Sequence, residues 1–210
     1  TLFRSSAASD VYKRQAKDGY MKKIAIFASG SGTNAQNIIA FFKKDTSAAV
    51  SLVLSNNPKA VVLERARIHQ VQTCVFDREQ FVSEAGVLKT LKSYDIDFIV
   101  LAGFLWKFPK TLLSHFTGNA INIHPALLPK YGGKGMYGKH VHRAVVAHKE
   151  RESGITIHYV NEHYDDGAII FQAKCRVLES DTAEDVAKKV HALEQQHFPK
   201  IIKQTIVSNG

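Results

Sequence analysis

The sequence predicts an α/β protein: a Rossmann-like parallel sheet flanked by helices, with an antiparallel extension toward the C-terminal end. From residue 22 onward, apolar runs typical of strands alternate with helical patterns of about ten residues. A Gly-rich turn at residues 29–34 joins the first of these strands to the first helix. Beyond residue 153 the alternation gives way to two consecutive strands, which predicts the antiparallel extension.

The parallel part of the sheet is predicted from short runs of β-branched and other apolar residues. These strands lie at residues 22–28, 50–54, 73–76, 98–101 and 121–124. Between them, helices are predicted after the Gly-rich turn, where Ile38, Ile39 and Phe42 share an apolar face, and at residues 61–69 and 81–91. Such βαβ units have right-handed crossovers, so these strands should run parallel.

The antiparallel extension begins at residues 154–160, where apolar and polar residues alternate. A second strand is predicted at residues 168–175. A helix is predicted at residues 182–197, and Asp181 and Glu184 before and within it have the spacing of an N-terminal capping pair.

Length and composition favour a single domain at residues 21–210. Of the 210 residues 45% are hydrophobic, but the apolar runs are too short to cross a bilayer, so no membrane association is expected. Residues 1–20 lack the apolar core of a signal peptide and show no periodicity, so we expect a non-native or disordered leader. Cys74 and Cys175 are isolated, which favours buried thiols in a reducing cytoplasm.

The net charge of +9 predicts an anionic partner, which charge alone leaves open between small molecules and nucleic acid. The basic residues are spread along the chain rather than gathered in a stripe with aromatic residues. This argues against a nucleic-acid-binding domain, which is the remote alternative. His140 and His142 lack a Cys or Glu partner at ligand spacing, so no metal site is expected.

The motif most suggestive of catalysis is NIHPALLP at residues 122–129. Asn122 and His124 are two residues apart on a predicted strand, so their side chains share a face. Pro125 ends the strand and places both at the carboxyl edge of the sheet, where open α/β sheets build active sites. An amide donor and an imidazole suit the oxyanion of an acyl transfer. A structural hydrogen-bonding pair is the alternative.

Two further segments can complete such a site. The turn at residues 29–34 brings backbone N–H groups and a helix N-terminus to one point, where a phosphate would fit. A turn without a ligand is the alternative, and Ala35 excludes the dinucleotide fingerprint. Asp165 or Asp166 can reach His124 and favour its protonated form, although an ordinary Asp-Asp-Gly turn has the same sequence.

Four motifs in this order resemble the folate-dependent formyltransferase family. They are SGSGTN (29–34), LAGF (101–104), NIHPALLPKY (122–131) and YDDGAII (164–170), and the resemblance runs from Met21 to about Ile206. It implies the formyltransferase fold and transfer of a formyl group from the cosubstrate 10-formyltetrahydrofolate to the amine of 5-phosphoribosylglycinamide, in purine biosynthesis. It further implies a monomer or homodimer that uses no metal.

The resemblance also implies roles for single residues. Asn122, His124 and Asp165 would be catalytic, with Asp165 holding His124 protonated. The substrate phosphate and ribose would bind at Gly32, Thr33, Asn34 and Glu194. Residues implied for the folate pocket are Asn122, the loop at 161–167, Arg78, Leu105, Trp106, Lys107 and Phe108.

Some points stay open at this level. Register with the family favours Asp165 over Asp166 as the catalytic carboxylate. The Gly-rich tract at residues 131–139 is longer than the family pattern, so the resemblance assigns it no role. The nearest alternative functions are formyl-folate hydrolysis and tRNA formylation on the same scaffold, each of which would be expected with an additional domain.

Overall fold

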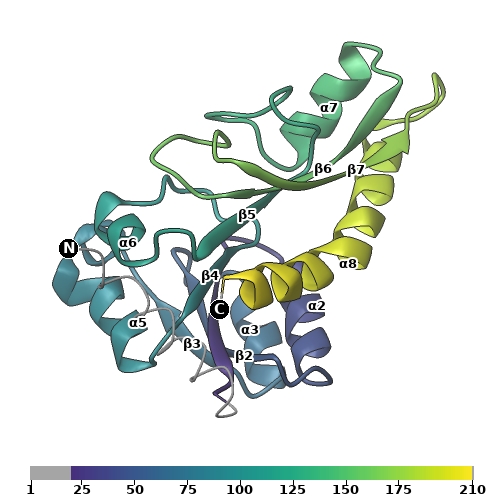
Figure 1. The fold of residues 1–210 in the computed structure, drawn as a ribbon. Coiled ribbons are helices and arrows are strands. Elements are labelled where there is room, and N and C mark those ends of the chain that lie inside the picture. The colour runs from purple at the N-terminus through teal and green to yellow at the C-terminus, as the bar shows by residue number, and fades with distance from the viewer. Residues whose placement is uncertain (1–19, 210) are drawn as a thin grey trace, which may run out of the picture.

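The computed structural model describes residues 20–209, so the leader expected at residues 1–20 lies almost wholly outside the described residues. Their centre is a seven-stranded sheet in the order β3-β2-β1-β4-β5-β6-β7. The strands are β1 (Lys22–Phe27), β2 (Ala48–Ser55), β3 (Gln72–Val75), β4 (Phe98–Leu101), β5 (Ala120–His124), β6 (Glu152–Tyr159) and β7 (Ile169–Arg176). Strands β1 to β5 pair in parallel, whereas β6 is antiparallel to β5 and β7 (Figure 1). The predicted fold class is confirmed.

Helices cover both faces of the sheet. They are α2 (Thr33–Phe42), α3 (Val61–Ile68), α4 (Arg78–Val82), the π-helical turn η1 (Glu84–Leu88), α5 (Lys89–Ser93), α6 (Lys110–His115), α7 (Lys139–Ala147) and α8 (Ala183–Ser208). The single helix predicted at residues 81–91 is wrong, because Gly86 has φ −94° and ψ −116° and breaks it into short pieces. The short helices α6 and α7 were missed by the sequence patterns.

Two apolar layers hold the helices to the sheet, because successive residues of a strand face opposite sides. Ile26 of β1 points into the layer under α2, α3 and α8, whereas its neighbour Phe27 points into the layer under α4, α5 and α6. Both side chains are fully buried. The sheet therefore forms the middle of three layers.

Helix α8 continues past its predicted end at residue 197 and contains Pro199. Proline lacks an N–H and usually marks the end of a helix. Here Phe198, Ile202 and Ile206 are buried on the face turned to the sheet, so apolar packing continues through the proline. Figure 1 shows that α8 changes direction partway along its length.

Candidate active site

A cavity of about 690 Å³ opens at the carboxyl ends of β1, β4 and β5, the edge at which the sequence predicts a site. Segments far apart in sequence form its wall: the turn at residues 29–34, residues 102–105, residues 122–125, the loop at 133–138 and one face of α8. The sequence-predicted residues that line it are Gly32, Thr33, Asn34, Leu105, Asn122, His124, Asp165 and Glu194.

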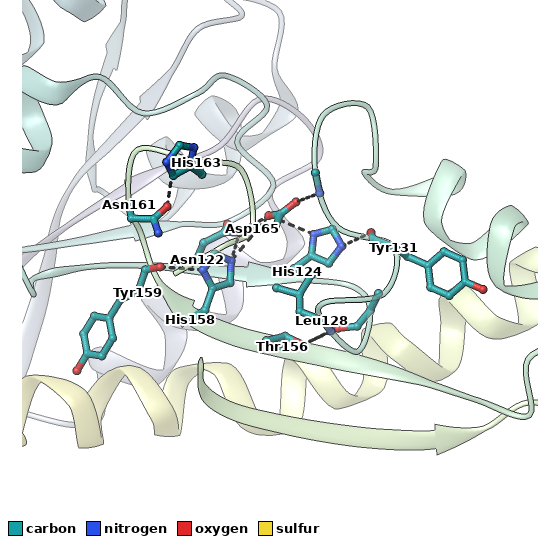
Figure 2. A network of polar contacts seen from close by, with 12 residues as sticks. Asn122, His124, Leu128, Tyr131, Thr156, His158, Tyr159, Asn161, His163 and Asp165 are labelled. Carbon is teal, nitrogen blue, oxygen red and sulfur yellow. Dashed lines mark hydrogen bonds and ion pairs between the residues drawn. The ribbon is translucent and has the colours of Figure 1, made fainter. Parts of the chain in front are cut away.

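Asn122 and His124 project from the end of β5 on the same side, and Asp165 meets both of them (Figure 2). The Asp165 Oδ1 atom lies 3.4 Å from His124 Nδ1 and accepts a hydrogen bond of 3.4 Å from Asn122 Nδ2. Its other oxygen accepts a hydrogen bond of 2.9 Å from the backbone N–H of Gly133. Asp166 is exposed, so the structure places Asp165 beside His124, as register with the family indicates.

The environment of Asp165 favours its ionised form. The side chain is only 12% exposed, and burial by itself raises its pKa. The hydrogen bond with His124, the charge of His124 and the Gly133 N–H outweigh burial and hold the pKa of Asp165 well below its usual range. The chain adopts the left-handed region at this residue, with φ +53°, so surrounding contacts hold a carboxylate in place at some conformational cost.

His124 lies between two acceptors. Its Nε2 atom is 2.7 Å from the carbonyl oxygen of Tyr131, and its Nδ1 atom faces Asp165. Both hydrogen bonds can form only if both ring nitrogens carry protons. The geometry therefore suits a protonated imidazole, the form that stabilises a developing anion.

His158 is a site residue that the sequence patterns missed. It lies opposite Asn122 in the β5–β6 register, is 3% exposed, and its Nε2 atom is 3.0 Å from Asn122 Nδ2. Its Nδ1 atom donates to the carbonyl of Tyr159 at 2.8 Å, so in the neutral ring Nε2 accepts from Asn122. The sequence pattern that could have indicated it is the alternation along residues 154–160, which puts His158 on a fixed face of the strand. That pattern does not show that His158 contacts Asn122.

A buried hydroxyl fixes the chain that follows His124. The Thr156 hydroxyl donates to the carbonyl of Ala126 at 2.7 Å and accepts from the backbone N–H of Leu128 at 3.0 Å (Figure 2). Gln172 donates to the same hydroxyl at 2.8 Å and to the Leu128 carbonyl at 3.0 Å. Strands β6 and β7 thus hold the turn after β5.

Tyr131 connects the Gly-rich tract to the site. Its carbonyl accepts from His124, and its hydroxyl donates to Glu150 at 3.0 Å. Residues 133–138 of the tract then line the cavity. The tract whose role the sequence left open is therefore part of the cavity wall.

His142 of α7 also lines the cavity. It is 7% exposed, and its Nδ1 atom has no hydrogen-bond partner among residues 20–209. Burial lowers the pKa of His142, while the nearby Glu194 and His124 act on it in opposite directions. A neutral, buried imidazole therefore lies near both His124 and α8.

The Gly-rich turn leads directly into α2. Gly32 precedes the helix with φ +73°, and no side chain of the described residues caps the first turn of the helix. Its backbone N–H groups are therefore directed toward the cavity end of the turn, where an anion can bind. Asn34 donates to Glu194 of α8 at 2.9 Å, so the turn and α8 form one continuous wall.

The structure does not bring all the predicted folate residues to the cavity. Of the segment 105–108, Leu105 lines it, whereas Trp106, Lys107 and Phe108 do not. Phe108 is 4% exposed and lies in the layer with Phe27 and Phe81. Arg78 is exposed, and its guanidinium carbon lies 4.0 Å from the centre of the Trp106 ring.

Other kinds of site find little support in the part of the chain that the structure describes. Residues 20–209 contain no group of three or more His, Cys, Asp and Glu side chains arranged to hold a metal ion. None of the helices in this range has the length and apolar character of a membrane span.

The chain is similar to curated phosphoribosylglycinamide formyltransferases over most of its length. The chain is 34% identical over 195 residues to phosphoribosylglycinamide formyltransferase of Bacillus subtilis, covering 90% of this chain and 97% of that protein. It is 38% identical to the chloroplastic enzyme of that name from Vigna unguiculata, covering 87% of this chain. The chain spans 60% of the length of this plant relative.

A solved structure is similar over nearly the same range. It is the phosphoribosylglycinamide formyltransferase of Bacillus halodurans, with a TM-score of 0.80 and 36% identity, covering 90% of this chain and 97% of that chain. The formyl transferase family model matches residues 22–202, which include every strand of the sheet. The chain therefore belongs to the formyl transferase family.

Proposed function

We propose that this chain transfers the formyl group of 10-formyltetrahydrofolate to the amine of 5-phosphoribosylglycinamide. The observation that supports it most directly is that the Asn122, His124 and Asp165 cluster and the turn at residues 29–34 line the same cavity. A site that joins acyl-transfer donors to an anion-binding turn suits a phosphorylated amine. The names of the relatives support phosphoribosylglycinamide as the acceptor of the formyl group.

In the proposed reaction, the amine nitrogen bonds to the formyl carbon and the carbonyl oxygen takes the electron pair. Asn122 and His124 are the donors for this oxyanion, and Asp165 keeps His124 charged and oriented. His124 Nε2 already donates to Tyr131, and the two Asn122 Nδ2 protons face His158 and Asp165. Binding therefore exchanges the His124–Tyr131 bond and the 3.4 Å Asn122–Asp165 bond for hydrogen bonds to the substrate. Collapse then breaks the bond to the folate nitrogen, which takes up the proton that the amine loses.

Each end of the cavity suits one substrate. The N-terminus of α2 favours a phosphate, and Glu194, whose side chain is 14% exposed, can accept hydrogen bonds from ribose hydroxyls. Leu105 and Tyr164 line the cavity and provide apolar surface for a pterin. Arg78 suits the carboxylates of a folate tail because its guanidinium can bind them with two hydrogen bonds.

An absorbance assay tests this proposal directly. Deformylation of a 10-formyl folate analogue is followed with and without 5-phosphoribosylglycinamide. Product that appears only with the ribonucleotide supports the transfer. Product that appears equally without it indicates formyl-folate hydrolysis, and folded protein that produces none in either condition contradicts the proposal.

A further inference from the structure

Pro199 leaves one carbonyl of α8 without its usual helical partner. In an α-helix the N–H of residue 199 would donate to the carbonyl of Gln195, but proline has no N–H. The side chain of Asn37 in α2 supplies the missing donor, with Asn37 Nδ2 2.9 Å from the Gln195 carbonyl oxygen. A side chain from another helix thus replaces a backbone hydrogen bond of α8.

This contact is one of three between the same turns of α2 and α8. Gln195 Nε2 donates to Asn34 Oδ1 at 2.9 Å, and Asn34 Nδ2 donates to Glu194 Oε2 at 2.9 Å. Asn34 and Asn37 are three residues apart and share a helix face. Asn34 and Glu194 line the cavity, whereas Asn37 does not.

Glu194 depends on these neighbours for its position. Besides Asn34, its carboxylate has His191 Nδ1 at 3.1 Å, and this hydrogen bond raises the pKa of His191. His191 lies one turn earlier on α8 itself. Of these two contacts, the one to Asn34 is the one that ties the Glu194 carboxylate to the turn at residues 29–34.

We propose that Asn37 and Pro199 form a positioning pair for the ribonucleotide. Pro199 frees the Gln195 carbonyl, and Asn37 binds that carbonyl and sets the position of α8 against α2. Asn34 and Glu194 are then held at the spacing that the phosphate and ribose require. The identity of the ligand in this inference rests on the proposed function, whereas the coupling of the two residues does not.

The first test is substitution of Asn37. Asn37→Leu has nearly the same volume but no donor, and we expect it to raise KM for the ribonucleotide about tenfold, the value of one hydrogen bond. Because Asn37 lies outside the cavity, kcat and KM for the folate should stay within about twofold, a change too small to indicate a lost hydrogen bond. Asn37→Asp, which keeps the shape and removes the donor, should raise the same KM at least as much.

The second test is a double-mutant cycle with Pro199→Ala. The variant has an N–H at residue 199 that can bond the Gln195 carbonyl within α8. Adding Asn37→Leu to Pro199→Ala should then change KM less than about twofold, against about tenfold in the parent chain. The proposal would be overturned if the effects of the two substitutions on KM for the ribonucleotide were additive. It would also be overturned if Asn37→Leu and Asn37→Asp each raised KM for the folate as much as KM for the ribonucleotide.

A control variant separates positioning from general helix docking. Lys203 of α8 and Asp45, beyond α2, form an ion pair at 2.6 Å away from the cavity. Lys203→Gln should lower the melting temperature without raising KM. If the parent transfers no formyl group to the ribonucleotide, the proposed function fails. The same double-mutant cycle, measured as melting temperatures, then still tests the coupling of Asn37 and Pro199. Non-additive changes in melting temperature support the coupling, and additive changes refute it.

Discussion

Asp165 is the residue at which three parts of the site meet. It accepts from Asn122 on β5, faces His124, and accepts from the Gly133 N–H of the Gly-rich tract. The catalytic role proposed for it follows from this position, since one carboxylate orients both oxyanion donors. Loss of its charge should therefore affect the reaction more than the fold.

Asp165→Asn should lower kcat about a hundredfold or more, because His124 and Asn122 lose the carboxylate that faces and orients both of them. The measurement is the formyl-transfer assay on protein shown to be folded by circular dichroism. Asp166→Asn is the matched control, because its side chain is the exposed neighbour. Equal kcat values for the two variants would contradict the role of Asp165.

Asp165 should also contribute pH-dependent stability. Its pKa is held below the usual range, so its stabilising effect is full above its unfolded pKa, about 4, and is lost as the pH falls through the lower folded value. The parent should therefore be more stable than Asp165→Asn at pH 6, and the difference should shrink below about pH 4. Urea unfolding at several pH values measures it. A difference that stays constant down to pH 2 would count against this linkage.

His158 should act through Asn122. His158→Phe removes the acceptor that faces Asn122 Nδ2, so the amide can turn away, and we expect kcat to fall about tenfold. His158→Gln keeps an acceptor and should recover most of that loss. Steady-state kinetics of both variants checks this, and equal losses would mean that His158 only fills space.

At the level of elements, the two glycines of the turn at residues 29–34 differ in the space available for a side chain. Gly32 has φ +73°, and a Cβ there would lie 2.4 Å from Val62 Cγ2 of α3. A Cβ added at Gly30 would have no atom within 4 Å. Of these two glycines, Gly32 is therefore the one that allows the turn to approach α3 closely.

Gly32→Ala should lower the free energy of unfolding by about 1–3 kcal/mol, because it adds both strain and overlap. It should also raise KM for the ribonucleotide, since the turn must shift. Gly30→Ala should change stability by less than about 0.5 kcal/mol. Chemical denaturation of both variants measures this, and similar losses would show that space at Gly32 is not the cause.

Several elements could be predicted because their patterns are local. The strands at the centre are continuous apolar runs, and the SGSGTN turn marks the first strand–helix junction. The end of α8 could not be predicted, because its buried residues after Pro199 are stabilised by a sheet that the local pattern does not contain. Gly86 similarly interrupts an otherwise regular apolar pattern.

On the scale of the whole molecule, both helical layers share one sheet, so they should unfold together. Ile202 of α8 is fully buried, and Ile202→Ala should lower the free energy of unfolding by about 2–5 kcal/mol. The only tryptophan of the chain, Trp106, packs against the opposite layer. Unfolding of this variant followed by Trp106 fluorescence and by far-UV circular dichroism should give the same loss in the free energy of unfolding. Separate midpoints would show that the layers unfold independently.

The sequence by itself determined the central strands, their order along the chain, and the placement of Asn122 and His124 on one face, because these depend on spacing within a few residues. Only the tertiary structure decided that Asp165 faces His124, that His158 lies against Asn122, and that Glu194 lies beside Asn34. It also decided that Phe108 packs in the core. Each of these depends on strand register or helix docking between distant segments, which the packing of the whole domain fixes and no local pattern contains.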